Sequence, residues 1–226
     1  MEEIESIQDF LENPDIEYVA QGLDLWQILT EDCSAFLLQL TQVLKCETDP
    51  IVSVEQLRSF EDLQDLFAAF PQKNYIAFWC LGLLASFEEY QEYNQQCTEL
   101  DLSQMKLERI PDTVNHLVHL RSLDLSLNGI SDIPLVDALL NLEWLNLSSN
   151  KLEDFDLDLC QLRSIEWLDI HDNPMEEIPT EIQNLTRLSY LNYQETQITR
   201  IPFLLAQKEK QGKLRIDRPS SPRRFV

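Results

Sequence analysis

The stretch SIEWLDIHDNP, residues 164–174, places a tryptophan, two aspartates and a histidine within six residues. His171 with Asp169 and Asp172 offers an imidazole and two carboxylates, which are acid/base groups and ligands for divalent metals. Asp169 and His171 would share one face of a strand, but Asp172 would begin the next turn, and no second histidine approaches in the pattern. We therefore expect no metal site and no catalytic group here.

Other signatures of an enzyme are weak. His116 and His119 fall between the segments that repeat, without a nucleophile placed beside them. No cysteine accompanies a histidine and a positive patch, so a thiolate nucleophile lacks activation. The chain has only 4 glycines and no glycine-rich phosphate loop. The sequence predicts a protein that is not an enzyme and that carries no cofactor.

The residue pattern of 164–174 recurs upstream as NLEWLNLSSNK, residues 141–151. Alignment on L-x-x-L-x-L-x-x-N-x-L gives five copies, 22 or 23 residues apart, which begin at Cys97, Leu120, Leu142, Ile165 and Leu188. A further 23-residue step reaches Gln211 and predicts a partial sixth copy. In that copy Lys213, Arg215 and Asp217 take the third, fifth and seventh positions.

This pattern resembles the leucine-rich repeat family, in the class of about 23 residues with an Ile-Pro pair after the strand. The pair occurs at 110–111, 133–134, 178–179 and 201–202, and Phe155–Asp156 replaces it in the middle repeat. The resemblance covers residues 97–217 and implies an α/β fold, a right-handed solenoid with a parallel β-sheet on its concave face. One unit cannot bury its apolar edge alone, so the units stack and each leucine row becomes a continuous core.

Asparagines occupy the ninth position of the three central repeats, at Asn128, Asn150 and Asn173. A side-chain amide can bond backbone groups of neighbouring turns that bending would otherwise leave unpaired. We predict this structural role rather than contact with a ligand. Met105 and Thr196 replace the asparagine in the terminal repeats, where something else is expected to cover the chain.

Alternation along each strand points the fourth and sixth positions into the core and the third, fifth and seventh toward solvent. The third position supplies an aromatic row on three consecutive strands: Trp144, Trp167 and Tyr190. The fifth supplies an acidic and amide row beside it, and the seventh adds a histidine: Asp101, Asp124, Asn146, Asp169, Asn192 and His171. Aromatic anchors beside charges are usual at interface hot spots, so we expect these nine residues to bind a partner.

Asp101 and Asp124 would lie on neighbouring strands about 4.8 Å apart. Like charges at that spacing cost on the order of 1–3 kcal/mol, depending on the effective dielectric. A lysine or arginine of a partner would neutralise the repulsion, and solvation is the alternative.

Residues 1–96 lack the repeat and predict helices. Asn13 caps the first helix with Pro14 at its first position, Ser53 and Gln56 form a capping box, and Pro71 begins a last helix. We expect this helical domain to cap the exposed end of the solenoid, with a separate recognition domain as the alternative. Residues 218–226 form a basic tail, either a disordered end or a short docking segment.

Charge and cysteine content bear on partners and location. The formal charge of −23 argues against nucleic acid and favours a basic protein partner, although acidity also aids solubility. The five cysteines include no C-x-x-C pair and no signal peptide precedes them, which predicts a cytoplasmic protein. The most apolar run, residues 75–87, has 13 residues and is too short for a bilayer core of about 30 Å.

These observations predict a non-catalytic protein–protein interaction module that acts as an adaptor or scaffold. An inhibitor such as an immunity protein that neutralises a basic bacterial toxin fits the same features. A secreted bacterial effector is a third possibility.

Overall fold

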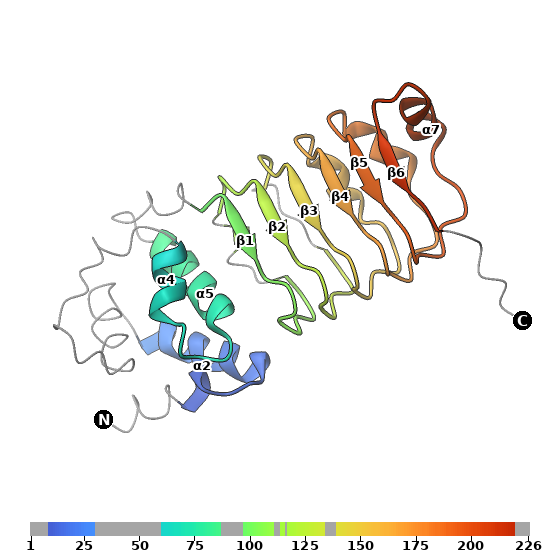
Figure 1. Ribbon diagram of the computed structural model, residues 1–226. Coiled ribbons are helices and arrows are strands. Elements are labelled where there is room, and N and C mark those ends of the chain that lie inside the picture. Colours follow the sequence, from blue (N-terminus) through green and yellow to red (C-terminus); the bar gives the residue numbers. More distant parts are fainter. Residues whose placement is uncertain are drawn as a thin grey trace, which may run out of the picture. The chain divides into compact units, whose positions relative to one another are not determined.

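The protein is described by a computed structural model over residues 9–29, 60–86, 97–110, 114–115, 117–133 and 139–219. The chain divides into two compact units, residues 1–97 and 98–226. Figure 1 shows helices in the first unit and a row of parallel strands in the second.

The described part of the first unit, residues 9–29 and 60–86, is mainly helical, as the sequence predicts. Its described helices are α2 (Ile16–Leu29), α4 (Phe60–Leu66) and α5 (Lys73–Ser86). Its core includes Leu11, Val19, Leu23, Leu63, Phe67, Ile76 and Phe78, each at most 1% exposed. No helix in the described part of the chain is long and apolar enough to cross a membrane. The predicted capping box at Ser53 and Gln56 lies outside the described residues, and the capping role of this unit stays a prediction.

The start of α2 corrects the predicted cap. The side chain of Asp15 accepts a hydrogen bond from the backbone N–H of Glu17 at 3.0 Å, as an N-cap residue does. Asn13 instead accepts from the backbone N–H of Asp15 at 2.8 Å, which forms a turn that leads into the helix. The helix therefore begins two residues later than predicted, and Pro14 precedes it.

The second unit contains one parallel sheet of six strands in chain order: β1 (Glu99–Asp101), β2 (Ser122–Asp124), β3 (Trp144–Asn146), β4 (Trp167–Asp169), β5 (Tyr190–Asn192) and β6 (Arg215–Asp217). The middle residue of each of the first five strands is a leucine that is at most 3% exposed. The sixth position of those repeats is also buried, at Leu102, Leu125, Leu147, Ile170 and Tyr193. The predicted solenoid and its leucine core are confirmed.

The asparagines at the ninth position form the predicted backbone ladder. Asn150 accepts a hydrogen bond from the backbone N–H of Ile130 at 3.1 Å and donates to the carbonyl oxygens of Leu125 and Leu147 at 2.9 and 3.0 Å. Asn128 and Asn173 make equivalent bonds one repeat away on either side. In the last repeat the Thr196 hydroxyl donates to the carbonyl oxygen of Tyr193 at 2.8 Å.

The turn after each strand passes through the left-handed region of backbone space. The eighth residue of every full repeat has φ between 53° and 60°: Gln104, Leu127, Ser149, Asp172 and Glu195. None of them is glycine, so each turn carries a conformational cost on the order of 1–2 kcal/mol. Asp172 lies in one of these turns, as predicted.

The sixth strand has a register two residues away from the predicted one. Arg215 pairs with Tyr190 and Asp217 pairs with Asn192, so Arg215 takes the third position instead of Lys213. The fifth position then belongs to Asp217 rather than to Arg215.

The shift follows from the segment that leads into β6. Earlier repeats return through short 3-10 turns, η4 (Leu157–Gln161) and η5 (Thr180–Asn184), whereas the last one contains helix α7 (Phe203–Lys210). An α-helix rises about 1.5 Å per residue and a 3-10 helix about 2.0 Å, so a helical return needs more residues for the same span. Gly212, with φ 69°, then reverses the chain into β6.

Candidate protein-binding face

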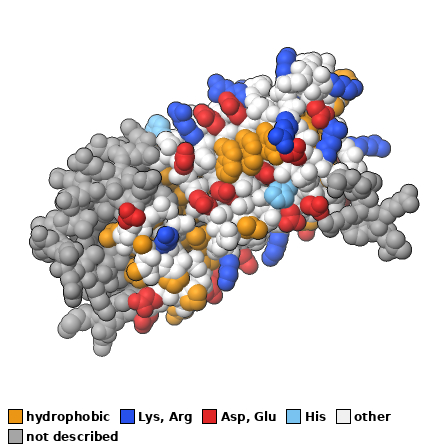
Figure 2. Space-filling model, in the orientation of Figure 1, with side chains coloured by type: hydrophobic (Ala, Val, Ile, Leu, Met, Phe, Trp, Pro, Cys, Tyr) orange, Lys and Arg blue, Asp and Glu red, His pale blue; other side chains and the backbone are white. Residues whose placement is uncertain are grey.

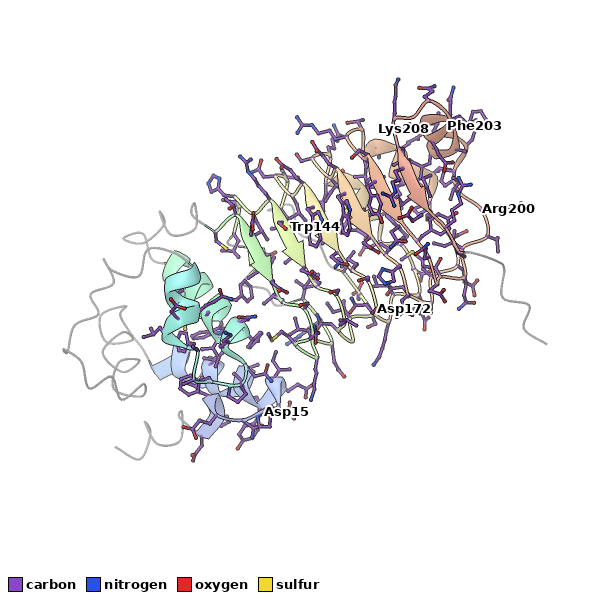
Figure 3. All side chains as sticks on the ribbon, viewed as in Figure 1. Asp15, Trp144, Asp172, Arg200, Phe203 and Lys208 are labelled. Atoms are coloured by element: carbon purple, nitrogen blue, oxygen red, sulfur yellow. The ribbon has the colours of Figure 1, made fainter. Side chains whose placement is uncertain are left out.

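Three aromatic rings stack across the middle of the sheet, and we call Trp144, Trp167 and Tyr190 the aromatic stack. The register places them directly opposite one another on β3, β4 and β5. The ring centroids of Trp144 and Trp167 are 4.5 Å apart with planes at 12°, and those of Trp167 and Tyr190 are 5.1 Å apart at 10°. All three rings are half-buried and lie opposite the leucine core, as predicted. Figure 2 shows a hydrophobic patch on the sheet face, and Figure 3 labels Trp144 on the sheet.

Arg215 closes one end of the aromatic stack. Its guanidinium carbon lies 5.4 Å from the centroid of the Tyr190 ring, within the range of a cation–π contact. The same guanidinium pairs with the Asp217 carboxylate at 3.1 Å, and the Tyr190 hydroxyl donates to that carboxylate at 2.8 Å. The Asp217 carboxylate therefore pairs with the charge of Arg215 and accepts a hydrogen bond from the hydroxyl of Tyr190.

This arrangement shifts the pKa of two of its members. Burial, the hydrogen bond to Asp217 and the nearby carboxylate charges raise the pKa of Tyr190 to about 12. The hydrogen bond from Tyr190 and the charge of Arg215 lower the pKa of Asp217 below its usual range. Asp217 is therefore a carboxylate whose charge the protein already compensates.

The fifth position of every strand is an aspartate or asparagine, and we call this set the acid–amide row: Asp101, Asp124, Asn146, Asp169, Asn192 and Asp217. In each of the first five members, one side-chain oxygen accepts a hydrogen bond from the backbone N–H two residues later, at 2.8–3.1 Å. The row therefore satisfies the donors that each strand exposes where it ends. The repeat pattern predicts partner binding for the first five of these residues but does not reveal this local role.

Amides separate most of the carboxylates in the acid–amide row. The amide of Asn146 donates to Asp124 at 3.2 Å, and the amide of Asn192 donates to Asp169 at 2.9 Å. Alternation of acid and amide from β2 to β6 avoids like charges on neighbouring strands. Asp101 and Asp124 are the exception, since they lie directly opposite each other in the register.

His171 lies beside the acid–amide row. Its Nδ1 is 2.8 Å from the Asp169 carboxylate, and the amide nitrogen of Asn192 is 3.4 Å from the same ring atom. Asp169 itself is 6% exposed, so His171 and Asn192 cover it rather than leave it open to a partner. Within the part of the chain that the structure describes, no three side chains of the metal-ligating types come together.

The three described cysteines are buried: Cys80, Cys97 and Cys160. Burial raises the pKa of the Cys97 and Cys160 thiols to about 12, with the charges of Glu181 and Asp156 adding to the shift at Cys160. A thiol with so high a pKa is a poor nucleophile at neutral pH. Cys160 is a small buried apolar residue, as predicted.

A family model described as Leucine Rich Repeat matches residues 141–162, which span the third repeat. No curated protein matches the chain.

Several solved structures are similar to the chain. They include a leucine-rich repeat protein of Leptospira interrogans, at 26% identity over 58% of this chain and 33% of that one, with a TM-score of 0.47. Internalin C2 of Listeria monocytogenes matches at 24% identity over 55% of this chain and 52% of that one, with a TM-score of 0.47. The BIR2 ectodomain from Arabidopsis thaliana matches at 27% identity over 61% of this chain and 77% of that one, also with a TM-score of 0.47. The chain thus spans a third to about half of the two bacterial proteins.

The repeats of the second unit are leucine-rich repeats. The family model covers one of them, and the sheet register repeats its spacing across the others. The predicted family resemblance and the solenoid fold are therefore confirmed.

Proposed function

We propose that the second unit is a non-catalytic protein-binding module. The face of its sheet that carries the aromatic stack would bind a basic protein partner. The observation that carries this proposal is the aromatic stack, three half-buried rings held in contact on the side of the sheet away from the core. Mutual stacking holds the rings in one conformation, so a partner that covers them loses little additional side-chain entropy. Large aromatic anchors of this kind commonly dominate the binding energy of an interface.

The charge around the aromatic stack supports a basic partner. Residues 97–207 carry 19 acidic and 7 basic side chains. Asp101 and Asp124 lie next to each other at the β1–β2 end of the sheet face, where an additional positive charge would relieve their repulsion. A phosphate backbone would meet the same negative field, which disfavours nucleic acid as a partner.

The proposed biological role is that of an adaptor or scaffold in the cytoplasm. An acidic protein that occludes a basic toxin uses the same surface and the same charge, so an immunity protein is the second candidate. A gene for a toxin beside the gene for this protein would favour that candidate. Translocation of the N-terminal segment out of the cell would instead favour a secreted effector.

The test is a comparative capture experiment from the native cell extract. The wild-type chain is compared with Trp144→Ala/Trp167→Ala and with Leu157→Ala/Phe203→Ala, which changes two exposed apolar residues, 53% and 79% exposed, on the return segments. We expect the tryptophan variant to lose the partner and the return-segment variant to keep it. Equal recovery by all three proteins would contradict the proposal.

A further inference from the structure

The two ends of the aromatic stack are built differently. At the β5 end, Arg215 of the next strand covers the outer face of the Tyr190 ring. At the β3 end, the next strand is β2, and its residue opposite Trp144 is Ser122. A serine side chain is too short to cover an indole ring, and no described cation lies over Trp144 in the way that Arg215 lies over Tyr190.

The carboxylates beside the two ends differ in the same way. Asp217, two residues after Arg215, pairs with that guanidinium. Asp124, two residues after Ser122, accepts a backbone N–H at 2.8 Å and the Asn146 amide at 3.2 Å. Among the described residues no lysine, arginine or histidine forms an ion pair with Asp124 or with Asp101 opposite it.

The nearest arginine along the chain does not fill this position. Arg121 precedes Ser122 directly, but its guanidinium is 3.8 Å from the Glu143 carboxylate and its side chain is 65% exposed. At the β3 end, the aromatic stack therefore presents an indole ring beside a small residue and two carboxylates that form no described ion pair.

We propose that this end of the aromatic stack, formed by Trp144, Ser122 and Asp124, is a site for an arginine side chain of the partner. The bound guanidinium would lie against the Trp144 indole and pair with Asp124, as Arg215 does with Tyr190 and Asp217 at the other end. Arginine suits this position better than lysine, because its planar group stacks on an aromatic ring and donates to a carboxylate with two N–H groups. This proposal depends on the proposed function, because it specifies one contact that the protein partner would make.

The experiment uses a capped Gly-Arg-Gly peptide as the probe and the same peptide with citrulline as its neutral analogue. The indole N–H signal of Trp144 in a two-dimensional NMR spectrum, assigned with Trp144→Phe, reports binding. We expect the arginine peptide to shift this signal with a Kd in the millimolar range, and the citrulline peptide to bind at least threefold more weakly.

Three variants test the position. Ser122→Arg supplies the missing cation from within the chain, so it abolishes the shift, whereas Leu157→Arg adds the same charge on a return segment and leaves the Kd unchanged. Asp124→Asn raises the Kd about threefold or more, as expected from loss of one charge partner. Dispersed amide signals verify that each variant is folded.

A Trp144 shift that is the same in Ser122→Arg as in the wild type would overturn the proposal, and so would a shift that is the same for arginine and citrulline. A Kd at least tenfold lower in the full chain with Arg223→Gln/Arg224→Gln would also overturn it, because the basic tail of this chain would then be the occupant. A partner that depends on Trp144 and Trp167 but binds Ser122→Arg and the wild type equally would contradict the arginine site and leave the proposed function standing.

Discussion

Arg215 lies over the ring of Tyr190, with its guanidinium carbon 5.4 Å from the ring centroid. The contact depends on the register of β6, which places Arg215 directly opposite Tyr190. It turns three stacked rings into a stack that is closed by a cation at one end and open at the other. The two ends therefore differ in what they offer a partner, although the strands that carry them are alike.

The ionisation of Tyr190 tests this closed end. We expect Tyr190 to titrate near pH 12, because burial, the bond to Asp217 and the carboxylate charges all favour the neutral phenol. Asp217→Asn removes one charge and should move the pKa toward the ordinary value near 10. Ultraviolet difference titration of the wild type against Tyr190→Phe isolates this one tyrosine.

The same pKa predicts how stability depends on alkaline pH. A tyrosine whose pKa is higher in the folded state binds its proton more tightly when folded, so its contribution is fully present below about pH 10 and is lost as the pH rises toward 12. Urea unfolding at pH 9 and pH 11 should show a smaller loss of stability in Tyr190→Phe than in the wild type. An equal loss in both would argue against the raised pKa of Tyr190 in the folded state.

Asn150→Ala should destabilise the second unit by about 3 kcal/mol, because it removes several buried bonds and leaves backbone groups unpaired. Asn141→Ala is the matched control. Its amide makes one exposed bond, to the carbonyl oxygen of Val118 at 2.9 Å, so we expect a cost of about 1 kcal/mol or less. Chemical denaturation measures both, and similar losses would mean that the ladder adds nothing beyond an ordinary surface bond.

Gly22→Ala should destabilise the first unit, although alanine is the better helix former by about 1 kcal/mol. A Cβ at this position would lie 2.3 Å from the Cβ of Phe10 and 2.5 Å from its Cγ, so the chain around Phe10 would have to move. We expect a net loss of about 1–3 kcal/mol. Gln21→Ala, on the exposed neighbouring residue, should be neutral, and a stabilised Gly22→Ala would show that Phe10 packs elsewhere.

Leu127→Gly should stabilise the second unit by up to about 1 kcal/mol, because Leu127 has φ 56° and glycine adopts that conformation without steric cost. Leu127 is 54% exposed, so little buried surface is lost. Leu140→Gly is the control, since Leu140 is 52% exposed and its φ is not in the left-handed region. A thermal melt in which both substitutions lower the Tm equally would contradict the argument.

The regular part of the fold could be predicted from sequence because every full repeat places its apolar residues at the same positions relative to its strand. Once the leucines of one strand are placed, alternation fixes the direction of Trp144, Trp167 and Tyr190. The sixth strand could not be placed this way, since its return segment forms a helix and no asparagine marks its turn. The sequence KEKQGK, residues 208–213, contains one signal, a glycine just after a helix of suitable composition.

The positions of the candidate residues on the sheet face were predictable, but the hydrogen bonds between them were not. The position of Asp169 on the sheet face follows from the repeat, whereas its coverage by His171 and Asn192 depends on side-chain directions. The same holds for Arg215 and Asp217, which share the face with Tyr190 but were assigned to the wrong positions along it. We expect Asp101 and Asp124, which lie opposite each other without a described ion pair, to contribute more to partner binding than the other carboxylates of the row.

The most direct test of the central claim is the dissociation constant of the purified partner for three forms of the chain, measured by calorimetry. We expect Trp144→Ala/Trp167→Ala to raise the Kd at least 30-fold, which corresponds to loss of about 2 kcal/mol at a hot spot. We expect Leu157→Ala/Phe203→Ala to leave it within twofold of the wild type. A Kd that is unchanged in the tryptophan variant, or raised as much by the return-segment variant, would contradict binding through the aromatic stack.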